Sequence, residues 1–379
     1  MRNNVFKDLL VLDFTQSLAG PYCTMLMANN GARVIKIERI DGGDLLRGAA
    51  PFDPEDNISL FWASVNSNKE SCVLDLKNPD DLIIIKNIIK KADVVVENFR
   101  PGVMDRLGLG YKDVCAIKPD IVYTSISGFG HTGPLAKMPG FDLVGQGISG
   151  MMTVNGDLEK DEGRVGFPIG DITSGMWAYM ATITGLCHRF MTGEPSYCDI
   201  SMLDGLFAML PAEVLNYTKA NKLAHPSGNH DPCSTPFGVI KTSDGAIIVA
   251  VLGGKLWVSF CEAIGRTNLI NHDLFKTSEL RLLHRADLSA IVRPIIKTKT
   301  TQEWVNIFTN AGVPNGLVNN IKDTCELPQI EAREMLVHSG KYTVAGNPIK
   351  IEFNGKILCE YNPPEKLGQS TAKIKTEFK

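Results

Sequence analysis

The sequence lacks the short patterns that mark most metal, hydrolase and dinucleotide sites. Its nine cysteines include no C-x-x-C pair and its seven histidines form no H-x-x-x-H or H-E-x-x-H pair, so we expect reduced thiols and no metal site. It has no G-x-S-x-G elbow, and the turn after its first expected strand is not G-x-G-x-x-G. A dinucleotide-binding dehydrogenase is therefore only a minor alternative. We keep it because Glu38 ends the second expected strand, where such an enzyme would have the acid that binds the ribose.

An excess of charge of one sign and a long hydrophobic run are also missing. Lys and Arg number 39 against 42 Asp and Glu, a formal net charge of −3, which argues against a nucleic-acid or membrane-surface partner. The longest apolar run, residues 176–187, is shorter than the about 20 residues of a membrane-spanning helix. Asp8 and Asp13 interrupt the amino-terminal stretch where a signal peptide would be apolar. We therefore expect a cytoplasmic, soluble protein.

Length and patterning predict an α/β protein of two domains. The chain has 379 residues, and a domain typically takes about 100–200. Residues 1–215 alternate strands with single helices, which predicts a large domain with a doubly wound, Rossmann-like parallel sheet, completed by residues 325–379. Residues 216–236 are polar and are predicted as a linker. Residues 237–324 are predicted as a smaller α+β domain with a return linker.

The expected elements follow from apolar periodicity and from Pro and Gly boundaries. Strands are predicted at 9–14, 33–38, 72–76, 93–99 and 120–126, and helices at 21–29, 79–91, 111–117, 172–190 and 202–214. In the small domain we expect a hairpin at 238–251 and helices at 256–264, 280–297 and 301–311. Residues 342–353 are predicted to be strand-like.

A ligand crevice is expected at the carboxyl ends of these parallel strands. Those ends carry Gln16–Pro21, Glu38–Arg39, Asn98–Arg100 and Ser127–Gly130. Four cations lie near these strand ends in the sequence: Arg39, Lys77, Arg100 and Arg106. Each of them alone resembles a solvated surface charge. Their joint placement beside one crevice favours a phosphate-bearing ligand.

Asp171 is the strongest catalytic candidate. It is predicted to precede the helix at 172–190 directly, where it would cap the helix and stay ionised, the form that a nucleophile needs. Gly170 and Gly175 are expected to leave space for a substrate. For Cys23 we expect core packing in preference to a reactive thiol, and for His131 a turn or a substrate-lining position.

Several motifs, in order along the chain, resemble the class III CoA-transferases of the CaiB/BaiF type. This is the family of formyl-CoA:oxalate and carnitine CoA-transferases, with α-methylacyl-CoA racemases as relatives. The motifs are Val11–Thr15, Ala19–Pro21, Gly31–Arg39, Asn68-Lys69, Leu74–Lys77, Ala92–Gly102, Asp171 with Ser174-Gly175, and Ala311–Asn319.

The resemblance implies an acyl-CoA:carboxylate CoA-transferase of the EC 2.8.3 type, with Asp171 as the catalytic aspartate and Asp142 as an acid near it. Asp171 would form an anhydride with the acyl group and then a thioester with CoA. CoA would enter as a substrate, no prosthetic group would be needed, and two chains would interlock as a homodimer. The positions that match CoA-contacting segments are Leu18, Ala19, Arg39, Leu74, Asp75, Leu76, Lys77, Asn98, Phe99, Arg100 and Arg106.

Two departures from the family pattern bear on the activity. The racemases have a histidine directly before the second acid, whereas this chain has Phe141, which cannot exchange a proton. A transferase is therefore favoured, with an α-methylacyl-CoA racemase or epimerase as the alternative. A non-catalytic CoA-binding protein is a further alternative, which the intact Asp171 disfavours. The long glycine-rich flap of the formyl-CoA enzymes is missing, so oxalate and formate are doubtful substrates.

Overall fold

The chain forms two compact units. The computed structural model describes residues 6–156, 163–353, 356–357 and 361–379. The larger unit combines Met1–Met152, Arg164–Leu223 and Pro328–Lys379, and the smaller one combines Thr153–Gly163 and Ala224–Leu327. The unit boundaries thus fall after residues 223 and 327, and no sequence signal assigns residues 153–163 to the small unit.

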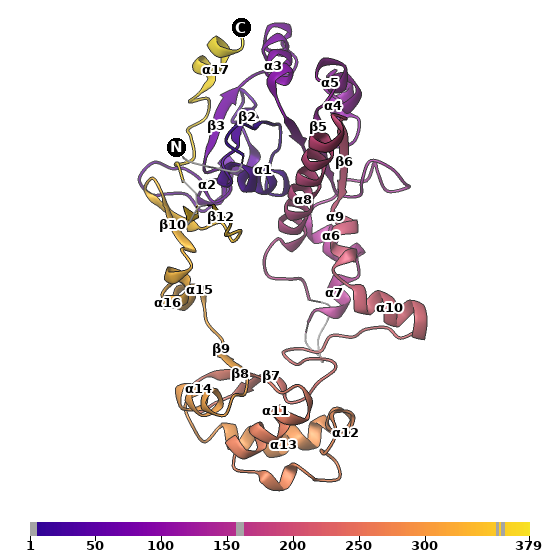
Figure 1. The fold of residues 1–379 in the computed structure, drawn as a ribbon, viewed down its shortest axis with the longest axis vertical. Helices are drawn as coiled ribbons and strands as arrows, with labels where there is room; N and C mark the ends of the chain where they lie inside the picture. The colour runs from indigo at the N-terminus through magenta and orange to yellow at the C-terminus, as the bar shows by residue number, and fades with distance from the viewer. Residues whose placement is uncertain (1–5, 157–162, 354–355, 358–360) are drawn as a thin grey trace. The chain divides into compact units, whose positions relative to one another are not determined.

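The large unit contains a six-stranded parallel sheet with the order β3-β2-β1-β4-β5-β6 (Figure 1). The order reverses between β1 and β4, as in doubly wound folds, so the predicted parallel α/β sheet is confirmed. The sixth strand, β6, was not predicted, because its sequence alternates exposed and half-buried residues instead of forming an apolar run. The strands are β1 (Leu10–Asp13), β2 (Arg33–Glu38), β3 (Lys69–Val73), β4 (Val94–Glu97), β5 (Val122–Ser127) and β6 (Ser196–Ser201).

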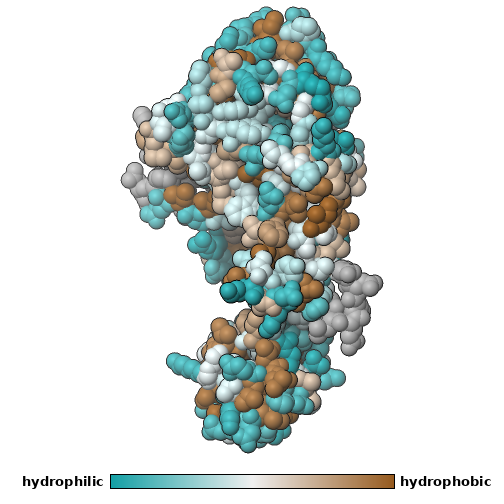
Figure 2. Space-filling view, turned by 90° about the vertical axis from the view of Figure 1, so that its right-hand side faces the viewer, coloured by the Kyte–Doolittle hydropathy of each residue, from teal (hydrophilic) through white to brown (hydrophobic). Residues whose placement is uncertain are grey.

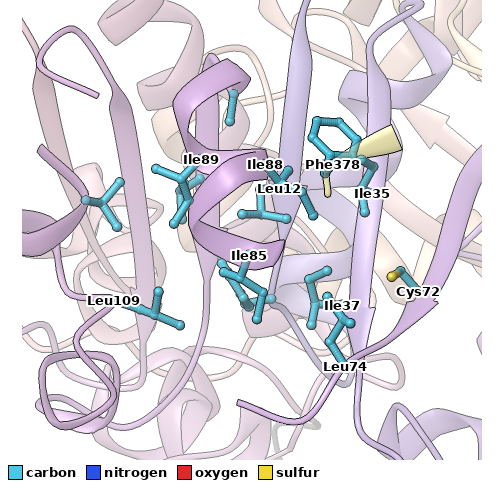
Figure 3. Close-up of a cluster of buried hydrophobic side chains, with 14 of the residues drawn as sticks. Leu12, Ile35, Ile37, Cys72, Leu74, Ile85, Ile88, Ile89, Leu109 and Phe378 are labelled. Carbon is cyan, nitrogen blue, oxygen red and sulfur yellow. The ribbon is translucent and has the colours of Figure 1, made fainter. Parts of the chain in front are cut away.

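Both faces of this sheet are buried, because successive residues of a strand point to opposite sides. On one face Leu12 of β1 packs with Ile85 and Ile88 of α3 (Pro79–Lys91), as Figure 3 shows. On the other face Val11 packs with residues of α1 (Ala19–Asn29) and with Ala178 of α8 (Ile169–Thr192). Helices on both sides therefore fix the strand ends that carry the candidate site.

The carboxyl-terminal residues cover the edge of the sheet at β3. The backbone N–H of Ser71 donates to Glu365 Oε2 at 2.8 Å, and that of Val73 donates to Thr371 Oγ1 at 2.9 Å. Phe378, which follows α17 (Thr371–Glu377), is buried in the core beside α3 (Figure 3). These bonds satisfy backbone groups that an open edge strand would expose.

The remaining elements are short in the large unit and mostly helical in the small one. Outside the small unit lie η1 (Leu45–Gly48), α2 (Leu60–Ala63), α4 (Val103–Arg106), α5 (Tyr111–Ile117), α6 (Asp142–Ile148), α7 (Met151–Val154, at the boundary), α9 (Met202–Ala208), α10 (Pro211–Ala220), α16 (Pro328–Ala332), β10 (Leu336–Ser339), β11 (Tyr342–Ala345), β12 (Glu352–Phe353) and β13 (Lys356–Ile357). The small unit has β7 (Phe237–Lys241), β8 (Ala246–Ala250), α11 (Gly253–Ala263), η2 (Thr267–Leu269), α12 (Ser278–Leu283), α13 (Arg285–Ile296), α14 (Thr301–Asn310), β9 (Asn315–Leu317) and α15 (Ile321–Cys325). Among the described residues, no helix combines the length and apolar character needed to span a membrane.

Two predicted helices are each divided in the structure. The helix expected at 202–214 is α9 followed by α10, because Pro211 has no N–H to continue a helix and instead starts a new one. The helix expected at 280–297 is divided at His284 into α12 and α13. Because α10 runs to Ala220, it also occupies the first residues of the predicted linker.

Candidate active site

Strands β1, β4 and β5 end beside a cavity of about 270 Å³ in the large unit. Its position, where the strand order reverses, is where sheets of this kind bind ligands. The lining combines the turn after β1, the segment after β4, the end of β5, the loop before α6 and the start of α8. The residues are Gln16, Ser17, Ala19, Leu45, Asn98, Phe99, Arg100, Pro101, Ile126, Ser127, Gly128, Ala136, Met138, Pro139, Gly140, Phe141, Asp171 and Met202.

Asp171 lies in the cavity wall as the third residue of α8. Burial, together with the charge of Asp142, raises the pKa of its carboxyl group to about 7. Within the described ranges no group donates a hydrogen bond to this carboxyl group. Its oxygens are therefore unengaged, and the carboxylate can act as a nucleophile once it is ionised.

Two expectations about Asp171 are wrong. The N-cap position of α8 belongs to Pro168, so Asp171 lies within the first turn and caps nothing. The helix start was also expected to keep the carboxylate ionised. Instead, the loss of solvation on burial and the charge of Asp142 raise its pKa.

Asp142 fills the capping role that sequence reasoning gave to Asp171. From the start of α6, its Oδ1 accepts the backbone N–H of Gly170 at 2.6 Å, and its Oδ2 accepts Gln146 Nε2 at 2.7 Å. A Cβ at Gly170 would lie 3.0 Å from Asp142 Oδ1 and 3.1 Å from Met202 Sδ. Gly170 thus allows Asp142 to approach α8, whereas the sequence suggested that it leaves room for a substrate.

Gly175 likewise serves helix packing and does not provide substrate space. A Cβ there would lie 2.6 Å from the carbonyl oxygen of Ala19 and 3.0 Å from the side chain of Tyr22. The close approach brings the start of α1, and with it the turn after β1, next to the first turns of α8. Packing at Gly175 therefore helps to set the distance between this turn and Asp171.

The turn after β1 is tied to the segment after β4. Asn98 Oδ1 accepts the backbone N–H of Gln16 at 2.8 Å, and Asn98 Nδ2 donates to the Gln16 carbonyl at 2.7 Å. Both polar groups of the Asn98 side chain thus bind the backbone. Ser17 follows with a positive φ of 63°.

The cavity brings together some of the residues proposed from the sequence to contact CoA and leaves others outside. Those in its lining are Ala19, Asn98, Phe99 and Arg100. Leu18 is buried against Leu46 and Trp62, and Leu74 is buried in the core beside α3. The rest lie outside the cavity, either exposed or half-buried: Arg39, Asp75, Leu76, Lys77 and Arg106.

Two secondary candidates have other surroundings. Cys23 belongs to α1 and lies in the core with Val11 of β1 and Ala178 of α8. Burial raises the pKa of its thiol, so this cysteine is a packing residue. The backbone N–H of His131 donates to Asp199, and its Nε2 lies 3.9 Å from Glu97 Oε1. In the described part of the chain, no group of three or more His, Cys, Asp or Glu is arranged to hold a metal ion.

Several lining residues were not singled out by the sequence. Leu45, Met138 and Met202 come from three segments that are far apart in the chain. Apolar residues in loops or helices give no local sign that they line a site. Only the fold, which brings these segments to the end of β1, identifies them.

The chain is similar over almost its whole length to known proteins. The family model described as CoA-transferase family III matches residues 6–371. The acetyl-CoA:oxalate CoA-transferase of Acetobacter aceti is 35% identical, with 98% of this chain and 95% of that protein aligned. The succinyl-CoA:glutarate CoA-transferase of Homo sapiens is 33% identical, with 99% of this chain and 86% of that protein aligned.

Solved structures show the same fold. A crystal structure of a CAIB/BAIF family protein from Brucella suis matches with a TM-score of 0.90 and 28% sequence identity, and the match covers 100% of both chains. The similarity in fold and the similarity in sequence therefore both extend over almost the full chain.

Proposed function

Because the chain belongs to CoA-transferase family III, we propose that it transfers CoA from an acyl-CoA donor to a free carboxylic acid through covalent intermediates on Asp171. The observation that carries this proposal is the carboxyl group of Asp171, which lies in the cavity wall with no hydrogen-bond donor in the described part of the chain. The side chain is half-buried, and a structural acid in such a position is normally engaged by a donor.

The proposed reaction exchanges acyl groups in four balanced steps. The Asp171 carboxylate attacks the thioester carbonyl, the C–S bond breaks, and an acyl–aspartyl anhydride and CoA thiolate form. The thiolate then attacks the aspartyl carbonyl, which gives an aspartyl–CoA thioester and releases the donor acid. The acceptor carboxylate repeats both steps in reverse and leaves as acyl-CoA. Each step uses only the carboxylate and the CoA thiolate, so no electron carrier is required.

A backbone N–H group in the first turn of α8 is suited to stabilise the oxyanions of these steps. Residues in the first turn of a helix have N–H groups without a partner inside the helix. Asp142 accepts the N–H of Gly170, and the carbonyls of Phe167 and Pro168 accept those of Ile169 and Ile172. Among the described residues, the N–H of Asp171 is the one in this turn without an acceptor, so it can bind the reacting oxygen. Asp142 would act through its position and charge and not as a nucleophile.

The CoA site is proposed along the strand ends around the cavity. Ala19 and Asn98–Arg100 line the cavity, which supports contacts to the thioester end of CoA. Arg39 and Arg106 are exposed at the ends of β2 and α4, where they suit the phosphates or the adenine of a longer ligand. Leu18 and Leu74–Lys77 complete the set by resemblance to the family.

Phe141 supports a transferase over the alternative racemase or epimerase. Its side chain is 72% exposed and lines the cavity beside Asp171. Proton exchange at the α-carbon in two directions needs two groups that can hold a proton, and a phenyl ring cannot be one of them. It can, however, cover an apolar part of an acyl group.

The acceptor is proposed to be a small dicarboxylic acid. The names of three relatives give oxalate, glutarate and mesaconate as the acid paired with the acyl-CoA. Arg100 supplies a cation in the cavity lining that can pair with a second carboxylate. Because the glycine-rich flap of the formyl-CoA enzymes is missing, we do not expect oxalate to be the preferred acid. Oxalate is still tested, because the Acetobacter aceti relative is named for it.

The protein is further proposed to be a homodimer, interlocked as the resemblance implies. An open groove of about 850 Å³ runs between α8, β6 and α9, and its lining includes Trp177 and Tyr197, each 39% exposed. Figure 2 shows the side of the large unit that carries β6, and hydrophobic residues are exposed there. Exposed apolar residues around a groove are found at protein interfaces, and we assign this groove to a second copy of the chain.

A mass-spectrometric screen of acyl-CoA donors against carboxylic acids tests the activity. With donor present, hydroxylamine should inactivate the enzyme and label a peptide that contains Asp171, because it intercepts activated acyl carbons. A label on Asp142 or Cys23 would refute the assignment of the nucleophile. Solvent-deuterium exchange at the α-carbon of an acyl-CoA, without transfer, would favour the racemase.

A further inference from the structure

A buried ion pair lies directly beneath the turn after β1. The side chains of Lys36 and Asp44 are 1% and 0% exposed, and Lys36 Nζ lies 2.9 Å from Asp44 Oδ2. Asp44 Oδ2 accepts no hydrogen bond from any residue that the structure describes, so its contact with Lys36 is an ion pair. Lys36 Nζ donates instead to the carbonyl of Thr15 at 2.6 Å.

A second buried pair supports the same turn. Lys69 Nζ lies 3.4 Å from Asp13 Oδ2 and donates to the carbonyl of Pro21 at 2.9 Å. Asp13 Oδ1 accepts the backbone N–H of Thr15 at 2.8 Å, and Asp13 Oδ2 accepts the hydroxyl of Thr24 at 2.6 Å. Both pairs thus end on backbone groups of residues 15–21.

The charges in this network balance one another. Burial opposes ionisation of Lys36, but the attraction of Asp13, Asp44 and Glu38 raises its pKa. Burial likewise opposes the ionised form of Asp13, and Lys36 and Lys69 nevertheless lower its pKa. The free energy that the buried ions lose on leaving water offsets much of their mutual attraction, so stabilising the fold is a weak explanation for such a network. The contacts they make are then the better guide to their role.

Asp44 connects the network to the cavity lining. Its Oδ1 accepts the backbone N–H of Ser17 at 3.0 Å and that of Leu46 at 2.9 Å. Ser17 lines the cavity with a φ of 63°, a left-handed backbone that a serine adopts only at a free-energy cost. Leu45, the residue after Asp44, also lines the cavity. One carboxylate therefore fixes two parts of the wall.

We propose that Asp44, with Lys36 as its buried counter-ion, is a positioning residue that holds Ser17 in its left-handed conformation and so sets the turn after β1 against Asp171. This inference rests on the proposed transferase function for its kinetic consequences. The turn would orient the donor thioester for attack, so its loss should lower kcat more than it raises KM for the donor.

Two double variants matched in charge test the proposal. Lys36→Met with Asp44→Ala removes the ion pair and the acceptor for the N–H of Ser17. Lys36→Met with Asp44→Asn removes the ion pair but keeps an acceptor oxygen. Neither double variant leaves Lys36 or Asp44 as a lone buried charge. Each variant is assayed at a temperature that lies the same number of degrees below its own Tm.

We expect the Ala double variant to have a kcat about five- to tenfold below that of the Asn double variant, the effect of losing a hydrogen bond to an uncharged acceptor. KM for the donor should differ less than about threefold between them. Equal kcat values, or a loss confined to KM, would overturn the proposal. Arg189→Met is the control, because it breaks the ion pair with Asp93 at 3.0 Å, a pair beyond the cavity lining, and should lower Tm without changing kcat.

A measurement that needs no activity separates this inference from the proposed function. Amide hydrogen exchange of a peptide spanning residues 14–20 should be faster in the Ala double variant than in the Asn double variant, because only the former leaves the N–H of Ser17 without its acceptor. If the peptide exchanges at the same rate in both double variants, the positioning role is overturned. This holds even if other peptides show that the Ala double variant is partly unfolded. A parent enzyme that transfers no CoA would refute the proposed function and leave the exchange result standing.

Discussion

Replacement of Asp171 by asparagine should abolish transfer and stabilise the fold at the same time. The substitution keeps the size of the side chain, but an amide is a poor nucleophile and neither the anhydride nor the aspartyl thioester can form. We expect transfer to fall by several orders of magnitude. A merely structural role would leave the rate nearly intact.

The stability gain follows from the raised pKa of Asp171. In the folded protein the carboxyl group has a pKa of about 7, against a reference value of 3.8. Between these values the folded state binds a proton that the unfolded state has lost, so stability is fully present below pH 3.8 and falls as the pH rises through 7. At 1.36 kcal/mol per unit, ionisation of Asp171 costs the fold up to about 4 kcal/mol at pH 8. The asparagine variant avoids this cost.

Urea unfolding of parent and variant at pH 4.5 and pH 8 measures the effect. The variant should be more stable than the parent at pH 8, and this advantage should shrink towards pH 4.5. Asp80→Asn is a matched control, because Asp80 is also an acid in the first turn of a helix but is exposed. It should leave transfer unchanged and cost about 0.3–1 kcal/mol by losing a favourable contact with the helix start. A folded Asp171→Asn enzyme that still transfers CoA, or whose relative stability is independent of pH, would contradict the reasoning.

The other predictions concern pH, CoA binding and assembly. The kcat/KM of transfer should rise with pH through about 7 as Asp171 ionises, and Asp142→Asn should move that rise to lower pH, since the Asp142 charge contributes to the raised pKa. Arg39→Ala and Arg106→Ala should each weaken CoA binding by about 10- to 150-fold while affecting turnover of bound donor less, which calorimetry and kinetics can separate. Parent-like binding of free CoA by both variants would place the CoA site elsewhere. Light scattering should give the mass of a dimer; a monomeric parent at micromolar concentration would contradict the assembly.

Strong local signals in the sequence predicted much of the large unit. The strand at 33–38 and the helix at 111–117 have the predicted bounds, and α3 begins at Pro79 with Asn78 as its cap, as expected from Asn-Pro at a helix start. These elements are bounded by Gly or Pro and carry clear apolar periodicity. By contrast, β6 depends on pairing with β5, and its alternating sequence gives only a weak signal by itself.

The position of the candidate site could be predicted, but its chemistry could not. The rule that ligands bind at the carboxyl ends of parallel strands identified Asn98–Arg100 and the turn after β1, and both line the cavity. The ionisation of Asp171 depends on burial and on Asp142, which is 29 residues away in the sequence. The roles of Gly170 and Gly175 likewise depend on what packs against them, which a sequence pattern cannot reveal.

Lys36 and Asp44 show why buried charges near a site are missed by sequence reading. A lysine inside an apolar strand and an aspartate in a Gly/Asp-rich loop are normally interpreted as solvated residues, because isolated ions are rarely buried. Here β2 lies beside β1 in parallel register, which brings Lys36 under the turn that follows β1, and the loop after β2 folds back so that Asp44 meets it. The fold-back of the loop after β2 therefore pairs the two charges, and strand order places the pair under the turn after β1. In a doubly wound sheet, residues that hold a turn at the candidate site can thus come from the strand beside it.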